Sequence, residues 1–377
     1  MKDISYLSIS DVHIGHPETS AEEIVEHLDD YFKGFGSDCP FNHIDMVFIV
    51  GDLWDDSIDF ASKTLGAFLP WFDRFLAWAH RREILVFILE GTPRHDRRQS
   101  ATLMSIISDS PHGGICKYIP SLCIQRIEEH DLTVLYVPDK CRPTAEAVAR
   151  DVQALFDEQG VEQVDIGMMH GMFKYQLGTI PMNNQVHEER FYLDKVKNFI
   201  SIGHVHTYST YERIVAQGSF DRLTHGQEEP KGAVLFTRID GEWSYRFVEN
   251  TKAKKYVDLE VKGDLDAMVK KIDKLTDQIP HGSSIRLVGD PLHPLFQGFS
   301  TLSVKYPFHT FKTKKLKKDE KKVSELELGS EDYKPVVLNR QTVTQAIYEE
   351  VSLNADLSIE ESKRLFELLE SNHLNEK

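Results

Sequence analysis

The feature that most constrains this sequence is a series of short apolar runs, each followed closely by Gly, Asp or His. Their lengths are typical of buried β-strands, and helical patterns lie between them. Strands that alternate with helices indicate a layered α/β fold. The predicted strands are Tyr6–Ser10, Met46–Val50, Ile84–Leu89, Thr133–Val137, Asp165–Met169 and Phe199–Ile202.

The helical patterns have local signals of their own. Ser20, with Glu23 three residues later, reads as a capping box that opens a helix. The apolar segment Phe60–His80 contains Pro70, which should kink or divide a helix. Further amphipathic helices are predicted at Ser100–Ser108 and Ala145–Phe156.

Composition limits the classes of protein to consider. A length of 377 residues predicts two domains, and 41% hydrophobic with 28% charged residues is ordinary for a soluble chain. The longest apolar runs are too short to cross a bilayer, and the first residues lack the apolar segment of a secretory signal. The four cysteines have no CxxC spacing, which fits a reducing compartment. We therefore expect a cytoplasmic protein of a bacterial cell or a phage-infected host.

The character of the sequence changes after about Asn250. We predict a main domain at 1–250, a smaller α+β domain at 251–310, a charged linker at 311–338 and a helical tail at 339–377. The lysine-rich segment Phe311–Lys322 is either a solvated linker or a strip that contacts phosphates. Elements expected here are strands Val257–Val261, Ser284–Val288 and Leu302–Tyr306 and helices Leu265–Leu275, Arg340–Val351 and Ile359–Leu369.

Polar residues of metal-binding type follow five of the predicted strands. They are Asp11 and His13, Asp52, His95 and Asp96, His170, and His204 and His206. Ligands bind at the carboxyl ends of strands in an open α/β sheet, so these side chains should converge. Imidazole combined with carboxylate suits Mn, Fe or Zn better than calcium. The number of ligands exceeds the need of one ion and favours two ions bridged by one carboxylate.

Each of these signals also has a purely structural interpretation. A histidine at a strand end is usually a surface or hydrogen-bonded residue, and an aspartate there is usually a turn former or a helix cap. The ordered recurrence of five such ends is what favours a metal site. The sequence has no phosphate loop of the G-x-x-x-x-G-K-[ST] type and no G-x-S-x-G elbow, which leaves chemistry by activated water.

The series DVH, GDLWD, HD, MHG and GHVH resembles the motifs of the calcineurin-like metallophosphoesterase superfamily over residues 1–250. Within it, the run Asp11–His16 resembles the opening of SbcD-type DNA repair nucleases. Segments Gly218–Leu223 and Gly226–Gly232 resemble the sequence after the last histidines of these nucleases. The resemblance implies an α/β layered metallophosphoesterase sandwich, with a smaller α+β DNA-capping domain and a C-terminal helical tail.

The resemblance also implies a ligand role for each matching residue. The set is Asp11, His13 and His206 for one ion, His170 and His204 for the other, and Asp52 as the bridge. Water activated by the two ions would attack phosphorus. The ions would be divalent, Mn²⁺ in the first place and Mg²⁺ as the second choice.

His95 would act as the general acid, or orient the leaving oxygen. Asp96 would steady the imidazole of His95, as carboxylates beside catalytic histidines do. Asp55 or Asp56 is an alternative partner for His95, and the sequence does not choose between them.

One loop departs from the superfamily pattern. The superfamily usually has Gly-Asn-His followed by an acid, and the Asn ligates the second ion, whereas this chain reads GTPRHD at Gly91–Asp96. Thr92 or a water could replace the Asn, because the guanidinium of Arg94 has no lone pair to offer. We expect a more weakly bound second ion and an Arg94 that either contacts the substrate phosphate or points to solvent.

The leading hypothesis is a metal-dependent DNA nuclease, with exonuclease activity on duplex DNA and endonuclease activity on other forms. The implied partners are DNA, a coiled-coil SMC-like ATPase bound by the C-terminal helices, and a second copy of the chain. A net charge of −16 disfavours loose binding to nucleic acid, so bases clustered near the site would have to contact phosphates. The candidates are His16, Arg94, Arg97 and Arg98.

Two other functions stay open. A metallophosphoesterase for a small phosphate ester would use the same ions but would not need the region after Asn250. A non-catalytic scaffold with a decayed site is supported only by the altered loop Gly91–Asp96. The tail helices could also fold back on the core instead of binding a partner.

Overall fold

The computed structural model describes residues 3–58, 62–179 and 185–315. They lie within one compact unit, Met1–Leu316. The predicted helical tail at 339–377 and most of the predicted linker at 311–338 lie outside the described residues. The domain boundaries expected at residues 250 and 338 stay predictions.

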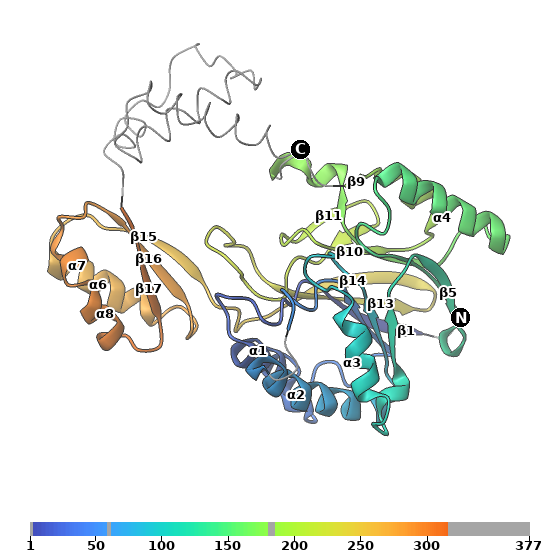
Figure 1. Ribbon diagram of the computed structural model, residues 1–377, viewed down its shortest axis with the longest axis horizontal. Coiled ribbons are helices and arrows are strands. Elements are labelled where there is room, and N and C mark those ends of the chain that lie inside the picture. The colour runs from blue at the N-terminus through green and yellow to red at the C-terminus, as the bar shows by residue number, and fades with distance from the viewer. Residues whose placement is uncertain (1–2, 59–61, 180–184, 316–377) are drawn as a thin grey trace, which may run out of the picture. The chain divides into compact units, whose positions relative to one another are not determined.

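Two six-stranded sheets form the centre of the structure (Figure 1). The first contains β1 (Ile4–Ile9), β2 (Met46–Val50), β3 (Leu85–Leu89), β4 (Cys116–Ile119), β13 (Gly232–Ile239) and β14 (Glu242–Glu249). Its order is β14-β13-β1-β2-β3-β4. Strands β1 to β4 are parallel, and β13 and β14 add an antiparallel hairpin beside β1.

The second sheet contains β5 (Cys123–Ile127), β6 (Leu132–Val137), β7 (Ile166–His170), β10 (Ile200–Gly203), β11 (Ser209–Tyr211) and β12 (Ile214–Ala216). Its order is β11-β12-β10-β7-β6-β5. The four central strands are parallel, and β11 and β5 are antiparallel edges. A separate pair is formed by β8 (Met172–Phe173) and β9 (Val186–His187). Because parallel neighbours end together, His170 on β7 lies opposite Gly203 on β10.

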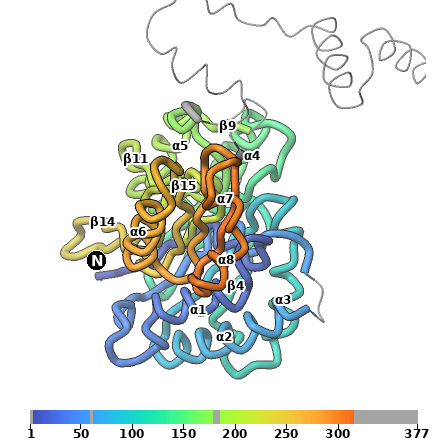
Figure 2. Tube along the Cα trace, turned by 90° about the vertical axis from the view of Figure 1, so that its left-hand side faces the viewer, coloured from blue at the N-terminus to red at the C-terminus, as the bar shows by residue number. Residues whose placement is uncertain are grey.

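Helices cover the two outer faces of this sandwich (Figures 1 and 2). They are α1 (Ala21–Tyr31), α2 (Lys63–His80) and α3 (Gln99–Ile107) on the first sheet and α4 (Ala145–Gln159) and α5 (Glu189–Lys195) on the second. Aromatic rings fill the space between the sheets: Tyr6 stacks on Phe236 at 4.7 Å and Phe48 on Phe87 at 4.9 Å between centroids. The layers run helix, sheet, sheet, helix, which confirms the predicted α/β sandwich.

Two local predictions for helices have opposite outcomes. The capping box is confirmed, because the Ser20 hydroxyl accepts the N–H of Glu23 at 3.2 Å at the start of α1. The division of α2 at Pro70 is wrong, because the helix continues through this residue. Phe68 and Trp71, on either side of Pro70, are buried in one core, and this packing offsets the missing N–H.

A smaller sheet with its own helices follows β14 within the same compact unit, and we call it the smaller unit. It contains the parallel strands β15 (Tyr256–Glu260), β16 (Ser284–Gly289) and β17 (Thr310–Lys315) and the helices α6 (Leu265–Thr276), α7 (Pro294–Gln297) and α8 (Phe299–Lys305). The strand expected at Leu302–Tyr306 is wrong, because these residues belong largely to α8, where Leu302 and Tyr306, four positions apart, are buried. Strand β17 runs past residue 311, where the linker was expected to begin, and Phe311 is buried in it opposite Ile285.

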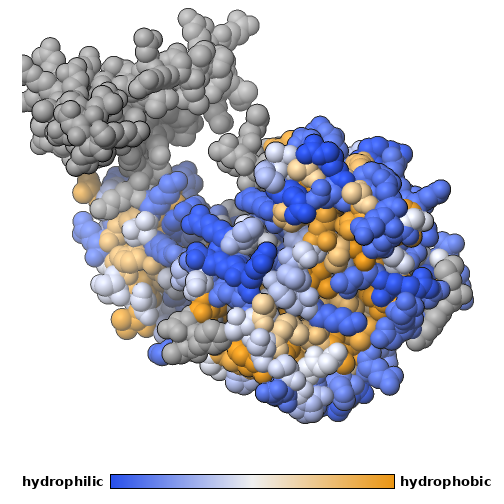
Figure 3. Space-filling model, turned by 45° about the vertical axis from the view of Figure 1, so that its right-hand side comes forward, coloured by the Kyte–Doolittle hydropathy of each residue, from blue (hydrophilic) through white to orange (hydrophobic). Residues whose placement is uncertain are grey.

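Short 3-10 helices complete the structure at Lys33–Phe35, Gly113–Ile115, Glu128–His130 and Lys174–Thr179. None of the helices in the described ranges combines the length and the apolar character that a bilayer crossing needs. Figure 3 shows hydrophilic residues over much of one face of the molecule, with hydrophobic areas between them.

Candidate metal centre

Four of the predicted ligands have a left-handed backbone. The angle φ is 52° at Asp11, 53° at His13, 48° at Asp52 and 93° at His204. Residues other than glycine rarely adopt positive φ, and those that do gather at functional sites. The carbonyl of Asp52 accepts the N–H groups of Val12 and His13 at 2.9 and 3.1 Å. The loops after β1 and β2 therefore hold each other in this conformation.

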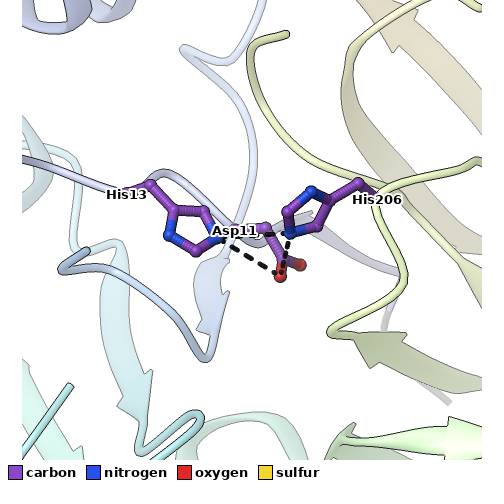
Figure 4. Close-up of side chains that lie close together, drawn as sticks. All are labelled: Asp11, His13 and His206. Carbon is purple, nitrogen blue, oxygen red and sulfur yellow. Dashed lines mark hydrogen bonds and ion pairs between the residues drawn. The ribbon is translucent and has the colours of Figure 1, made fainter. Parts of the chain in front are cut away.

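Asp11, His13 and His206 converge in what we call the first position (Figure 4). The Nε2 atoms of His13 and His206 lie 3.9 and 3.5 Å from Asp11 Oδ1 and 3.3 Å from each other. Asp11 is buried, and its Oδ2 accepts the Ser10 hydroxyl at 2.5 Å and the N–H of His204 at 3.0 Å. These bonds hold the carboxylate against both imidazoles.

Asp52, His170 and His204 form the second position. Nε2 of His170 is buried and lies 3.2 Å from Asp52 Oδ2. The Thr92 hydroxyl lies 3.1 Å from Asp52 Oδ2 and 3.2 Å from His204 Nδ1. Thr92, one of the two predicted substitutes for the missing Asn, thus contacts two residues of this position.

Asp52 lies between the two positions. Its Oδ2 is 3.9 Å from His13 Nε2 on one side and 3.2 Å from His170 Nε2 on the other. A Cβ at Gly91 would lie 2.1 Å from the backbone nitrogen of Asp52, so only glycine allows the two loops to approach this closely. A carboxylate within reach of both groups has the placement that a bridging ligand needs.

Hydrogen bonds on the far side of two imidazoles turn them toward the centre. Nδ1 of His13 donates to Asp55 Oδ1 at 2.9 Å, and Nδ1 of His170 donates to the Val50 carbonyl at 2.7 Å. Since both partners accept, each Nδ1 carries a proton and each Nε2 faces the site, where it can bind a cation once its own proton has left.

The two positions differ in their electrostatics. Burial opposes the ionised form of Asp52, but His170 outweighs burial and holds the pKa of Asp52 well below its usual range. Burial likewise opposes charge on His170, yet Asp52 raises the pKa of His170 to about 10. In the first position, burial lowers the pKa of His206 to about 4. A cation in the second position must therefore displace a proton from His170, whereas His206 is already neutral.

His95 lies beside the first position, with its ring centroid 4.9 Å from that of His13. Its Nδ1 donates to the backbone carbonyl of Asp55 at 2.5 Å. Asp55, one of the two alternative partners, is thus the residue that orients His95. Asp56, the other alternative, is exposed and pairs with Arg97.

Asp96 has a different place from the one predicted. It is buried and does not steady His95. Its carboxylate accepts the N–H groups of Asp52, Trp54 and Gly91 at 3.2, 3.0 and 2.7 Å. Asp96 therefore ties the Asp52 loop to the Gly91 loop and acts on the site through the backbone.

The predicted DNA contacts surround the site. The ring of His16 lies 6.5 Å from that of His13, between centroids. Exposed side chains on the loop before α3 are Arg94, Arg97 and Arg98. Arg97 is partly neutralised by Asp56 at 2.7 Å. Contact of these residues with DNA stays a prediction.

Three residues to which the sequence analysis gave no role lie at the site. Gln227 Nε2 is 3.0 Å from His206 Nδ1, and the buried Lys231 donates to the His206 carbonyl at 2.7 Å. Asp139 is buried two residues after β6. Like the predicted ligands, Asp139 comes shortly after a predicted strand. An aspartate that follows a proline is also typical of a turn, and this explains why the sequence analysis gave it no role.

The ligand sets fit divalent metal ions. In each position the three ligand atoms lie within 4.8 Å of one another, as they also do in the set His13, Asp55 and His95. The mixture of imidazole and carboxylate suits first-row transition metals. The strongest sign of fit is that the buried Nε2 of His170 faces the buried Oδ2 of Asp52 at 3.2 Å, so that a cation could take both as ligands.

No protein-family model matches the chain, and no curated protein matches it. Among solved structures the chain is similar to GAP50, the anchor in the inner membrane complex of Plasmodium, with a TM-score of 0.40 and 10% identity over 67% of this chain and 87% of that one. It is also similar to TT1561 of Thermus thermophilus, with a TM-score of 0.35 and 10% identity over 65% and 99%. Likeness at this level says nothing about function. The class rests on the chain's own features: an α/β sandwich with His and Asp clusters able to hold metal ions where its strands end.

Proposed function

We propose that this chain is a two-metal phosphodiesterase of the metallophosphoesterase superfamily that cleaves DNA, as SbcD-type nucleases do. The observation that carries the proposal is the convergence of two ligand sets on Asp52, with His95 beside them. The residues that would hold two divalent ions, Mn²⁺ by preference, are Asp11, His13, Asp52, His170, His204 and His206. Bound ions would lower the pKa of water and polarise the phosphodiester.

His95 is the proton donor in this proposal. Its Nδ1–H is fixed on the Asp55 carbonyl, so Nε2 is the atom that gives a proton to the leaving oxygen. Such proton transfer contributes roughly 10²–10⁴-fold to a rate. The Asp55 carboxylate also holds His13, so one residue positions both a ligand and the proton donor.

The sheet of the smaller unit supports a nucleic acid as the substrate. One face of this sheet is buried on its helices, and the other presents Arg286, Lys312 and Lys314, of which Arg286 pairs with Asp258 at 2.6 Å. Lys312 pairs with Glu18, two residues after His16. Cations of this kind contact phosphates without reading the base sequence. A small phosphate ester would have no use for them.

The partners are proposed on the resemblance alone. They are a coiled-coil SMC-like ATPase bound by residues 339–377 and a second copy of the chain, in the cytoplasm. A chain truncated before residue 339 should lose the ATPase in a pull-down while the intact chain retains it. Equal recovery with both chains would refute the proposed role of the tail.

The test of the nuclease proposal is cleavage of end-labelled duplex DNA with Mn²⁺, Mg²⁺ or a chelator, for wild type and His95→Ala. We expect Mn²⁺-dependent degradation that the chelator abolishes and the substitution reduces at least about 100-fold. Hydrolysis of a chromogenic diester without DNA cleavage would instead favour the small-ester function. No activity on either substrate and no bound metal would favour the scaffold.

A further inference from the structure

We infer that Asp139 belongs to the second position, where its carboxylate holds a water ligand of the ion and so adds a negative charge to a site that lacks the usual Asn. The inference rests on the two-ion site of the proposed function. It concerns a residue outside every motif that the sequence analysis used.

The topology brings Asp139 to this position. Strands β6, β7 and β10 are parallel neighbours in the second sheet, so they end at the same edge. Val137 at the end of β6 lies opposite Met169 on β7, and Asp139 follows two residues later. Three adjacent strand ends thus supply Asp139, His170 and His204.

Asp139 is buried without an adequate partner. Its residue is 4% exposed, and its Oδ2 has no hydrogen bond among the described residues. The nearest cation is Lys140, whose Nζ is 4.0 Å from Oδ2, beyond hydrogen-bond distance. Burying an ionised carboxylate in this way is costly unless a cation or a bound water compensates.

The carboxylate lies toward the second position. A Cβ on Gly171, the residue after His170, would be 3.7 Å from Asp139 Oδ1. This distance places the Asp139 carboxylate beside the residue that follows His170, on the His170 side of the centre.

A water-mediated contact fits the spacing better than direct ligation. The ligand atoms of Asp52, His170 and His204 lie within 4.8 Å of one another, and among the described residues Asp139 does not join that set. Asp139 also lines a cavity of about 610 Å³, together with Pro93 and Arg98. A space of this size admits water to the carboxylate.

A second role is open to Asp139, as the counter-charge of His187. His187 is buried, its Nδ1 lies 3.1 Å from the Tyr192 hydroxyl, and burial lowers its pKa to about 4 despite the opposing charge of Asp139. If this were the only role, neutralising Asp139 would change local stability and leave metal affinity unaltered.

The test is a Mn²⁺ titration of the full chain by isothermal titration calorimetry, with wild type and Asp139→Asn. We expect the Mn²⁺ affinity of one of the two sites to fall at least about tenfold and that of the other to stay unchanged. Substitution of residues that support a metal ligand typically lowers affinity roughly 10–100-fold. Asp151→Asn is the matched control, because Asp151 lines the same cavity but pairs with Arg142. It should bind Mn²⁺ as the wild type does.

The outcomes separate this inference from the proposed function. Equal affinities in wild type and Asp139→Asn would overturn the inference and leave the two-ion site intact. Equal weakening of both sites would also overturn it, because the effect would not belong to the second position. A wild type that binds no Mn²⁺ would overturn the proposed function itself. If Asp139→Asn fails to fold by circular dichroism, Asp139→Ser, whose smaller side chain leaves room for water, takes its place.

Discussion

The two halves of the candidate metal centre are built differently, although they share Asp52. Each position combines two buried ligands with one partly exposed histidine, His206 in the first and His204 in the second. In the first position, desolvation holds the imidazole of His206 neutral. In the second position, the pairing of the buried His170 with Asp52 neutralises both groups internally.

This difference shows how one fold can keep a cluster of buried carboxylates and imidazoles stable without a cation. A protonated His170 can compensate Asp52 until an ion arrives. In the first position, burial opposes charge on His13, but Asp55, Asp52 and Asp11 raise its pKa, while His206 is neutral and hydrogen bonds hold Asp11. A cation must therefore displace the proton of His170 in the second position, whereas in the first it meets the neutral imidazole of His206.

The largest effect is expected from Asp52→Asn, which removes the residue that both positions share. We expect loss of both ions and a fall in DNA cleavage of more than about 100-fold, beyond the range for residues behind a ligand. Metal content by mass spectrometry and the cleavage rate measure this. Asp157→Asn, an exposed carboxylate on α4, should behave as the wild type. Loss of only one ion would show that Asp52 is not a bridge.

His95→Ala should separate chemistry from metal binding. His95 lies beside the first position but is held by a backbone carbonyl, so its removal should leave both ions bound. We expect cleavage to fall roughly 10²–10⁴-fold. A parallel loss of metal would make His95 a ligand and not a proton donor.

The stability of the metal-free chain should distinguish the two positions directly. His170→Gln leaves the buried Asp52 without its charge partner, which should cost about 3 kcal/mol in the free energy of unfolding. His206→Gln replaces a neutral imidazole and should cost less than about 1 kcal/mol. Urea denaturation in the presence of a chelator measures both. Equal costs would contradict the internal neutralisation of the second position.

Stabilisation by Mn²⁺ should grow with pH. The pKa of His170 is raised in the folded chain, so binding of its proton stabilises the metal-free chain. This stabilisation is complete below about pH 6.5, the ordinary pKa of histidine, and it is lost progressively as the pH rises toward 10. The ion binds only the deprotonated imidazole, so metal affinity should rise up to about tenfold per pH unit. The difference in Tm with and without Mn²⁺, measured at several values from about pH 6.5 to about pH 8.5, checks this. A difference that is independent of pH would mean that His170 is not displaced.

Much of the fold follows from local sequence patterns, because buried parallel strands are near-continuous apolar runs. Runs such as Met46–Val50 can therefore be recognised as strands from the sequence, and the Ser20 cap marks the start of α1. The lysine-rich strand β17 was not predicted, because its outer face is polar and Phe311 alone marks its buried side in the sequence. In α2, tertiary packing overrode Pro70, which no local rule could anticipate.

The candidate ligand sets were predictable because parallel strand ends meet at one edge, and each candidate ligand lies at the end of a strand or within a few residues after it. The supporting contacts were not. Asp96 lies next to His95 in sequence, but its carboxylate bonds to the backbone of other loops, and Asp55 orients His95 through a carbonyl that no side-chain pattern reveals. Asp139 resembled a turn residue until its burial was known.

The central claim is that two distinct ions share Asp52, and a Mn²⁺ titration of the full chain followed by electron paramagnetic resonance tests it most directly. We predict two Mn²⁺ per chain with the spectral signature of spin-coupled ions, lost in Asp52→Asn. One Mn²⁺ per chain, or two whose signals are uncoupled and insensitive to that substitution, would contradict the account.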